Sequence, residues 1–287
     1  MPAQADEIVV TAQRTGVPVW RVVSPTTTLV LIGSIEGVAK DTKWNAAALT
    51  ETLTKADRVM FPSMVGVSAS PFSMVGYLIK WRKQANLPRG RSLAQMLPPA
   101  QFQRLVALQK RGLIKPGFEG KHPLHLSIAL RNVAEGKRGY GPSASDYVRT
   151  AAKKYKIKMV PIATMRAKRV ANDFFTTPPS AYLPCLMDSV ALLEAGPGAV
   201  KARSDAWAQR RVQAVLSSPA EQVQESCLPP AFSAHKPQDL RSEMHNLLRQ
   251  KPLTVAVVEL KTLARPGGIL DNLQAAGYDI RGPRWKD

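Results

Sequence analysis

Two histidines three residues apart, His122 and His125, are the first residues whose spacing is compatible with metal chemistry. Side chains at this spacing share one face of a helix, and imidazoles are common zinc ligands. A zinc site needs a third or fourth ligand, and no cysteine or acidic residue stands at a suitable spacing nearby. Pro123 fits the first turn of a helix, with His122 just before it. The pair therefore predicts the start of a surface helix rather than a metal site.

Positive charge is the second chemical feature of the chain. It holds 40 lysines and arginines against 21 acidic residues, and the resulting formal charge of +19 predicts attraction to polyanions. One stretch of the sequence is especially basic and has no acidic residue. Its cations are Arg149, Lys153, Lys154, Lys156, Lys158, Arg166, Lys168 and Arg169. This run is either an anion-binding surface or a solvated basic face spread over several helices.

The composition favours some anionic partners over others. Aromatic residues make up only 6% of the chain, whereas binders of single-stranded nucleic acid commonly combine cations with stacking rings. We therefore expect an anionic polymer or a lipid headgroup, or a protein partner, before nucleic acid. No apolar run reaches the roughly 18 to 20 residues that cross a bilayer. No phosphate-loop or Gly-x-Ser-x-Gly motif occurs, and no cofactor is expected.

The elements that must position these residues are strands near both ends of the chain and helices between them. Apolar runs predict strands at 19–23, 28–32, 57–61, 157–162, 253–258 and 278–280. Apolar periodicity and proline positions predict helices at 44–56, 72–83, 99–111, 123–134, 144–154, 181–193, 198–216, 237–250 and 267–276. The closing strands can join the opening ones only if the chain ends pair in space. We therefore expect one domain over 18–287, with a mixed central sheet, after an extended segment at 1–17.

Cys185 and Cys227 are the only cysteines in the sequence. The N-terminal Ala3-Gln4-Ala5 resembles a signal-peptidase site whose leader has been removed. It predicts a periplasmic or exported protein, with a cytosolic one as the alternative. Two cysteines in an oxidising compartment usually pair, and antiparallel helices of similar length would bring these two together. We expect a disulfide, with two buried thiols as the alternative.

Stretches at both ends and in the middle of the chain carry a family resemblance. They are residues 18–22, 28–35, 56–59, 193–200, 205–208, 255–258, 266–270 and 276–278. Through them the chain resembles the TraB/GumN family, a distant relative of Tiki-type metalloproteases, and within it an exported branch with paired cysteines. The likeness covers essentially the whole chain. It implies an α/β (mixed α+β) fold with a central mixed sheet flanked by many helices and a helix-rich middle.

The resemblance also implies a metal site made by two Gly-x-x-His motifs and a glutamate, which together hold a divalent metal and an activated water. This sequence has changed all three ligands. Glu36 follows Gly33 where the first histidine belongs, Pro62 replaces the glutamate and Thr262 replaces the second histidine. Proline has no ligand atom, and Lys261 adds a cation that repels a metal ion. We therefore predict a degenerate site with no metal and no catalytic residue.

The residual crevice candidates are Gly33, Glu36, Glu259 and Lys261. Glu36 and Glu259 could act as an acid/base pair, as two carboxylates do in glycoside hydrolysis, or a carboxylate could merely pair with Lys261. The main prediction is an exported TraB/GumN-like pseudoenzyme that acts as a binding or accessory protein for an anionic partner. One alternative is an active Tiki-like metal-dependent hydrolase or protease with an altered site. The other is a basic protein that associates with nucleic acid or a membrane surface.

Overall fold

The computed structural model describes residues 16–25, 27–61, 64–66, 71–135, 140–161, 164–228, 240–250 and 253–286. Its central strands are β1 Val19–Val23, β2 Thr28–Ser34, β4 Arg58–Phe61, β7 Lys158–Pro161, β9 Thr254–Glu259 and β10 Asp279–Arg281. They form one six-stranded sheet in the order β10-β1-β2-β9-β4-β7. The two ends of the chain therefore meet in one sheet, as the apolar runs of the sequence predict.

The pairing within this sheet is mixed. Strand β1 is antiparallel to β2 and to β10, whereas β2, β9, β4 and β7 run parallel to one another. Every residue of β2 is buried, because a parallel strand at the centre of a sheet is covered on both faces. The mixed α/β fold class is confirmed.

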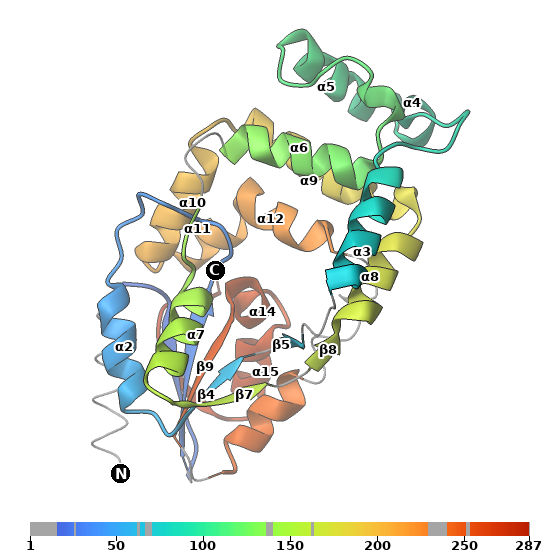
Figure 1. The fold of residues 1–287 in the computed structure, drawn as a ribbon. Coiled ribbons are helices and arrows are strands. Elements are labelled where there is room, and N and C mark those ends of the chain that lie inside the picture. The colour runs from blue at the N-terminus through green and yellow to red at the C-terminus, as the bar shows by residue number, and fades with distance from the viewer. Residues whose placement is uncertain are drawn as a thin grey trace.

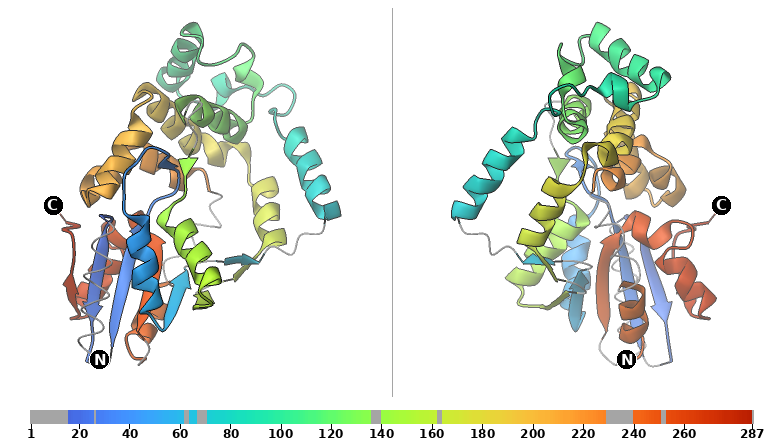
Figure 2. Two further views of the ribbon diagram at one scale, coloured as in Figure 1. Left: turned by 60° about the vertical axis from the view of Figure 1, so that its left-hand side comes forward. Right: turned by 90° about the vertical axis from the view of Figure 1, so that its right-hand side faces the viewer.

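Short helices cover both faces of the sheet. They are α2 Ala46–Thr54, α7 Ala144–Lys154, α14 Leu260–Ala264 and α15 Ile269–Ala275. Helix α7 buries Ala144, Val148, Ala151 and Ala152, which recur on one helical face. Figure 2 shows α2 and α7 on one side of the strands and α14 and α15 on the other. We call the sheet with these four helices the sheet region.

A second apolar cluster lies among the helices drawn at the top of Figure 1. We call this part the helical region. Its helices are α4 Leu93–Met96, α5 Pro99–Lys110, α6 Pro123–Glu135, α9 Leu183–Glu194 and α12 Pro219–Ser226, with short turns η1 Phe118–Gly120 and η3 Pro179–Tyr182. Leu105, Phe118, Leu130 and Leu186 are buried in the cluster. Each region therefore has its own apolar core.

Two helices run side by side and pack against the helical core through Trp81 and Phe174. They are α3 Pro71–Lys83 and α8 Ala167–Thr176, and they extend from the paired strands β5 Met64–Gly66 and β8 Thr164–Arg166 (Figures 1 and 2). Tyr77 and Phe175 stack between the helices with ring centroids 6.0 Å apart. Strands β3 Val38–Ala39 and β6 Tyr140–Gly141 form a further pair. The sequence analysis did not predict these four strands, since each has only two or three residues.

The long helix predicted at 198–216 is wrong. The structure has two helices there, α10 Ala199–Ala208 and α11 Val212–Leu216. The chain turns between them at Arg210, whose φ is +60°. Left-handed backbone ends a helix, and glycine is the usual residue there, so an arginine gives no sequence signal for the break.

The helix predicted at 237–250 and the expected lack of a membrane span can be compared with the structure only for the described residues. Of the helix predicted at 237–250, residues 237–239 lie outside the described residues, and 240–247 are helical. Among the described residues, no single helix is long and apolar enough to span a membrane. The bent pair Pro179–Glu194 and Ala199–Ala208 meets that test by length and composition alone.

Candidate functional site

The parallel strands β2, β9, β4 and β7 end at the same side of the sheet. We call these strand ends and the loops after them the carboxyl edge. Ser34 at the end of β2 lies opposite Glu259 at the end of β9. Glu36 follows β2 by two residues and Thr262 belongs to α14, directly after β9. Ligands in parallel α/β proteins bind at such strand ends, so Glu36 and Thr262, which the sequence predicts to be changed ligand positions, lie where a site would be expected.

The side chains after β9 bond to neighbouring protein groups. Thr262 donates its hydroxyl to a Glu259 carboxylate oxygen at 3.4 Å. Lys261 donates its ammonium group to the side-chain oxygen of Gln222, on α12, at 3.1 Å. Pro62, the third altered position, lies outside the described residues. Among the described residues, no group of three or more histidine, cysteine or acidic side chains could hold a metal ion.

Glu36 lies in an acidic part of the carboxyl edge. Although the residue is exposed, desolvation of its carboxyl raises the pKa, and the charges of Asp146 and Glu259 raise it further. Arg149 and Arg203 oppose the increase. The structure therefore brings Glu36 and Glu259 close enough to interact electrostatically, and a raised pKa such as that of Glu36 is what a general acid requires.

The start of helix α7 closes one side of this edge. The buried Ser34 hydroxyl accepts the backbone N–H of Ser145 at 3.2 Å. Ser143 caps the helix, and the Asp146 carboxylate accepts from the Ser143 backbone N–H at 3.1 Å and from its hydroxyl at 2.8 Å. Asp146 thus acts as part of a capping box. The Asp146 carboxylate that raises the pKa of Glu36 therefore also serves to cap helix α7.

Gly33 is favoured by close packing, and its backbone conformation does not demand glycine. It belongs to β2, and a Cβ there would lie 2.7 Å from the Leu260 side chain and 3.1 Å from the Trp20 ring. A side chain here would therefore have to displace the end of Leu260 and press on the Trp20 ring. The carbonyl of Gly33 accepts the Trp207 indole N–H at 2.7 Å. Gly33 therefore lets α10 and α14 approach the end of β2.

Arg203 is the main functional candidate that sequence reasoning missed. It lies on α10 and is only 2% exposed. Its guanidinium group donates to the backbone carbonyls of Glu36 and Gly37, and to the carbonyl of Ala220 at 3.1 Å. It also donates to the Glu221 carboxylate at 3.2 Å. These partners fix the loop after β2, which carries the first altered ligand position.

The Arg203–Glu221 ion pair is almost fully withdrawn from water. The side chains are 1% and 8% exposed. Burial lowers the pKa of Arg203 and raises that of Glu221, and the charge of each partner opposes the effect on the other. The sequence gives no signal that Arg203 is buried, because the carbonyl groups of Glu36 and Gly37 that it binds are more than 160 residues away in the chain.

The predicted basic run occupies α7 and the elements that follow it. Arg149, Lys153, Lys154, Lys156 and Lys158 are all exposed. Arg149 also lies over the Phe61 ring, 5.4 Å from its centroid, at the carboxyl edge. The backbone places Arg166 in β8, and Lys168 and Arg169 in α8. We call the first five of these cations the basic face.

The histidine pair differs from its prediction as a surface feature. His122 is 6% exposed, and its Nδ1 accepts the backbone N–H of Leu124 at 3.2 Å. Burial, followed by the charge of His125, lowers the pKa of His122 to about 4. His125 lies against the Trp81 ring with centroids 3.9 Å apart. The surface location was wrong, because the apolar helical region covers the helix start.

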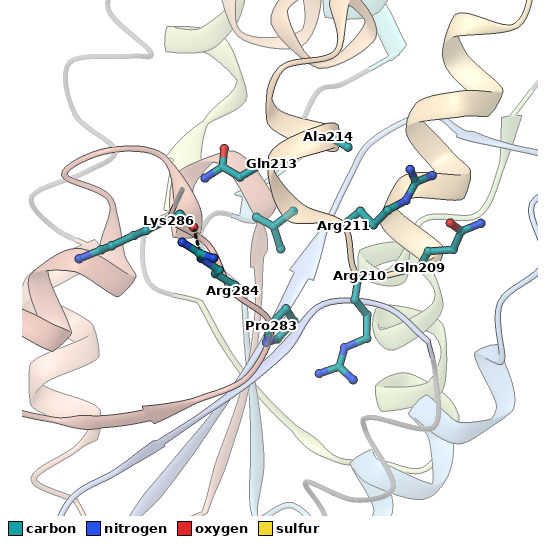
Figure 3. Close-up of a pocket in the computed structure, with 9 residues that line it drawn as sticks. Gln209, Arg210, Arg211, Gln213, Ala214, Pro283, Arg284 and Lys286 are labelled. Atoms are coloured by element: carbon teal, nitrogen blue, oxygen red, sulfur yellow. Dashed lines mark hydrogen bonds between the residues drawn. The ribbon is translucent and has the colours of Figure 1, made fainter.

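A basic groove lies between the α10–α11 turn and the C-terminal tail, away from the positions that sequence reasoning considered. It has a volume of about 590 Å³ and is drawn in Figure 3. Its described lining residues are Gln209, Arg210, Arg211, Val212, Gln213, Ala214, Pro283, Arg284 and Lys286. Four of them are cations and, among those described, none is acidic.

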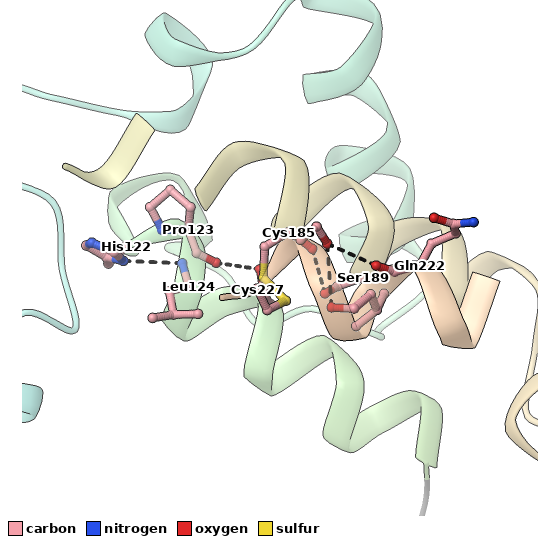
Figure 4. Close-up of a disulfide and its surroundings, with 10 residues drawn as sticks. His122, Pro123, Leu124, Cys185, Ser189, Gln222 and Cys227 are labelled. Carbon is pink, nitrogen blue, oxygen red and sulfur yellow. Dashed lines mark hydrogen bonds between the residues drawn. A yellow bond between two sulfur atoms is a disulfide. The ribbon is translucent and has the colours of Figure 1, made fainter. Parts of the chain in front are cut away.

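The predicted disulfide is present. Cys185 on α9 and Cys227 just after α12 are bonded, with their Cα atoms 4.6 Å apart. Figure 4 shows the bond beside the start of α6 at Pro123. It lies in the core of the helical region and joins positions 42 residues apart in sequence. Disulfides form and persist in oxidising compartments, which agrees with the predicted export.

Comparison with known proteins gives a significant match to a protein family. The sequence model of the TraB/PrgY/gumN family matches residues 18–282. The match runs from the residue before β1 to the residue after β10, and so includes the sheet region and the helical region. Neither a curated protein nor a solved structure matches the chain significantly.

Proposed function

The chain belongs to the TraB/PrgY/gumN family, and from this premise we propose that it is an exported pseudoenzyme. In this proposal it has kept the family fold, has lost metal-dependent hydrolysis and acts as a binding or accessory protein. Its partner carries negative charge and meets the basic face. The segment 18–287 acts as one domain behind an extended N-terminal segment.

The observation that carries the proposal is the position of Arg203. Its guanidinium group is held by the backbone carbonyls of Glu36 and Gly37, directly beneath the first altered ligand position. An arginine stays protonated in proteins, and a fixed cation in a poorly solvated place repels a divalent metal ion. The loop that would present the first ligand is thus anchored around a positive charge of the protein itself.

The neighbouring side chains support the same conclusion. Thr262 bonds to Glu259, and Lys261 bonds to Gln222 on α12. A hydroxyl group bound to a carboxylate is a weak replacement for an imidazole ligand. Pro62 offers no ligand atom at all. Each change is small, but together they remove two nitrogen ligands and one oxygen ligand from the family pattern.

The disulfide and the basic face support an exported binding role. Cys185 and Cys227 pair, which favours an oxidising compartment. The basic face is made of exposed side chains on and just after α7. An acidic polymer or a lipid headgroup outside the cytoplasm would meet these cations without a stacking aromatic surface.

One specific observation favours a second candidate, an active hydrolase with an altered site. The pKa of the Glu36 carboxyl is raised by burial and by two nearby carboxylates, one of them Glu259. Such a pair is the arrangement in which one carboxyl gives a proton and the other accepts one. The same residues therefore decide between the pseudoenzyme and the altered enzyme.

A hydrolysis assay separates the two candidates. The purified chain is incubated with a peptide library and with oligosaccharides, with and without added Zn²⁺, Mn²⁺ or Co²⁺. We expect no turnover above buffer, and no difference between the wild type and the variants Glu36→Gln and Glu259→Gln. Turnover that either substitution abolishes, while the variant keeps its unfolding temperature, would establish the altered enzyme.

A further inference from the structure

The groove between the α10–α11 turn and the C-terminal tail is a second place where the protein concentrates positive charge. We propose that this groove binds a short segment of an acidic polysaccharide, with Arg210, Arg211 and Arg284 as the residues that contact its carboxylates. The inference goes beyond the proposed function, because none of these residues belongs to the basic face or to the carboxyl edge.

The backbone at Arg210 gives the first reason. Arg210 follows the end of α10 with φ at +60°, and its N–H and that of Arg211 bond back to Trp207 and Ala206. Glycine occupies the corresponding position after α5, α9 and α15, at Gly112, Gly196 and Gly277. Only glycine adopts this conformation without strain. Strained positions of this kind cluster at functional sites, and among the described residues only Lys156, after α7, shares this conformation without being glycine.

The side chain of Arg210 gives the second reason. Its Nε atom is buried and has no hydrogen-bond partner in the described part of the chain. A buried donor without a partner costs free energy. Because Nε itself has almost no surface open to the groove, an anion there would bond to the terminal nitrogens of the guanidinium group, which present their donors to a carboxylate in one plane.

The groove also keeps most of its charge available. Lys286 is paired with Asp271, with 3.2 Å between Nζ and Oδ1. Arg284 donates its Nε to the backbone carbonyl of Lys286 at 3.0 Å, which orients the group without neutralising it. For Arg210 and Arg211, no carboxylate among the described residues forms an ion pair. Three of the four cations thus remain without a counter-charge in the described structure.

The spread of the charges indicates the class of ligand. Figure 3 shows the three arginine side chains fanning out around the groove instead of converging on one point, which suits a ligand with spaced negative groups. Gln209 and Gln213 add amides that match sugar hydroxyls, and the Gln213 amide is oriented by its bond to the Trp285 carbonyl at 2.6 Å. No aromatic ring belongs to the described lining, whereas single-stranded nucleic acid is held largely by stacking.

The experiment measures binding of a fluorescent hexamer of uronic acid to the full chain at one ionic strength. The test variant is Arg210→Gly, Arg211→Gln and Arg284→Gln combined. The matched control, Lys110→Gln, Arg111→Gln and Lys115→Gln, removes the same charge from exposed positions of the helical region. We expect the test variant to weaken binding at least about tenfold, because charge-assisted bonds are lost. The control should weaken it less than about twofold, because separated surface charges are screened.

A single substitution separates binding from folding. Arg210→Gly removes the guanidinium group and relieves the left-handed strain, so it should leave or raise the unfolding temperature while weakening the hexamer. Equal losses in the test variant and the control would overturn the inference in favour of general charge attraction. So would absence of hexamer binding, or equal or tighter binding of a 12-nucleotide single-stranded DNA. The proposed function fails on different evidence, namely hydrolysis or a metal at the carboxyl edge.

Discussion

The sheet region and the helical region have apolar cores of different kinds. In the sheet region, β2 and β9 are buried almost throughout, and their neighbours cover them on both sides. The helical region has a smaller cluster, crossed by the Cys185–Cys227 bond and containing the buried His122. A small core often requires a covalent bond for stability. We infer that apolar burial alone stabilises the sheet region, whereas the helical region also depends on the disulfide for its stability.

Arg203 connects the two regions. Its helix, α10, packs Val200 in the helical cluster and Trp207 in the sheet cluster. The guanidinium group bonds to the loop after β2 on one side and to α12, through Ala220, on the other. Arg203 therefore lies at the joint between the two regions, where the dependence of each region on the other can be tested.

The largest change in the free energy of unfolding is expected from substitutions at this joint. Replacing Arg203 by alanine leaves the Glu221 carboxylate buried without its partner, which typically costs about 3–5 kcal/mol. Chemical denaturation should show this loss in the free energy of unfolding. The double variant Arg203→Met and Glu221→Leu, which removes both charges, should recover most of it. A loss below about 1 kcal/mol in Arg203→Ala would show that the pair does not hold the regions together.

The next effect concerns the helical region alone. Replacing Cys185 and Cys227 by alanine frees a loop of 42 residues in the unfolded chain, and we expect a loss of about 3–4 kcal/mol. Hydrogen exchange should show lower protection in α6, α9 and α12, with the strands β2 and β9 less affected. Equal loss in both regions would mean one cooperative core. Two alkylated thiols per chain in unreduced protein would contradict the disulfide itself.

Lowering the pH should destabilise the helical region through His122, which is buried there. The pKa of His122 is about 4 in the fold and about 6.5 when unfolded. Between these values the unfolded state binds a proton that the fold excludes, so stability is full above pH 6.5 and falls as the pH drops towards 4. We expect His122→Gln to remove about 2–3 kcal/mol of this acid-induced loss. His245→Gln is the control, on the helix at 240–247 that packs against the sheet core, and an unchanged pH profile for His122→Gln would contradict the assignment.

The smallest effect on stability is expected at the basic face. Neutralising Lys153, Lys154 and Lys158 together should change the unfolding free energy by less than about 0.5 kcal/mol at each exposed site. Retention on heparin, measured as the salt concentration at elution, should nevertheless fall. The matched control removes three exposed cations of the helical region, by Lys110→Gln, Arg111→Gln and Lys115→Gln. Equal shifts in elution would make the basic face an ordinary solvated surface.

The sequence predicts those features that depend on local pattern. Buried strands such as Thr28–Ser34 are continuous apolar runs, and the helix Ala144–Lys154 has matching periodicity and a capping serine. Cys185 and Cys227 have only each other as partners. The family resemblance rests on such segments at both ends of the chain, and the match over residues 18–282 confirms it.

The features that the sequence does not predict depend on tertiary contacts. Arg203 looks like a surface cation on a helix, and only the approach of Glu36, Gly37 and α12 makes it a buried centre. His122 was expected at the surface because it precedes Pro123 at a helix start, and groups that pack against it, such as Tyr182, are remote in sequence. At Arg210, the left-handed turn occurs without glycine, so the break between α10 and α11 leaves no local mark.

Metal content of the purified chain is the most direct test of the pseudoenzyme proposal. The protein is purified without chelator, saturated with Zn²⁺, Mn²⁺ or Co²⁺, desalted and analysed by mass spectrometry of the metal. With Glu36, Pro62 and Thr262 at the ligand positions and Arg203 bonded to the Glu36 carbonyl, we expect no stoichiometric metal. About one equivalent of metal per chain, held by a ligand set of the family's kind and lost in Glu36→Ala, would contradict it.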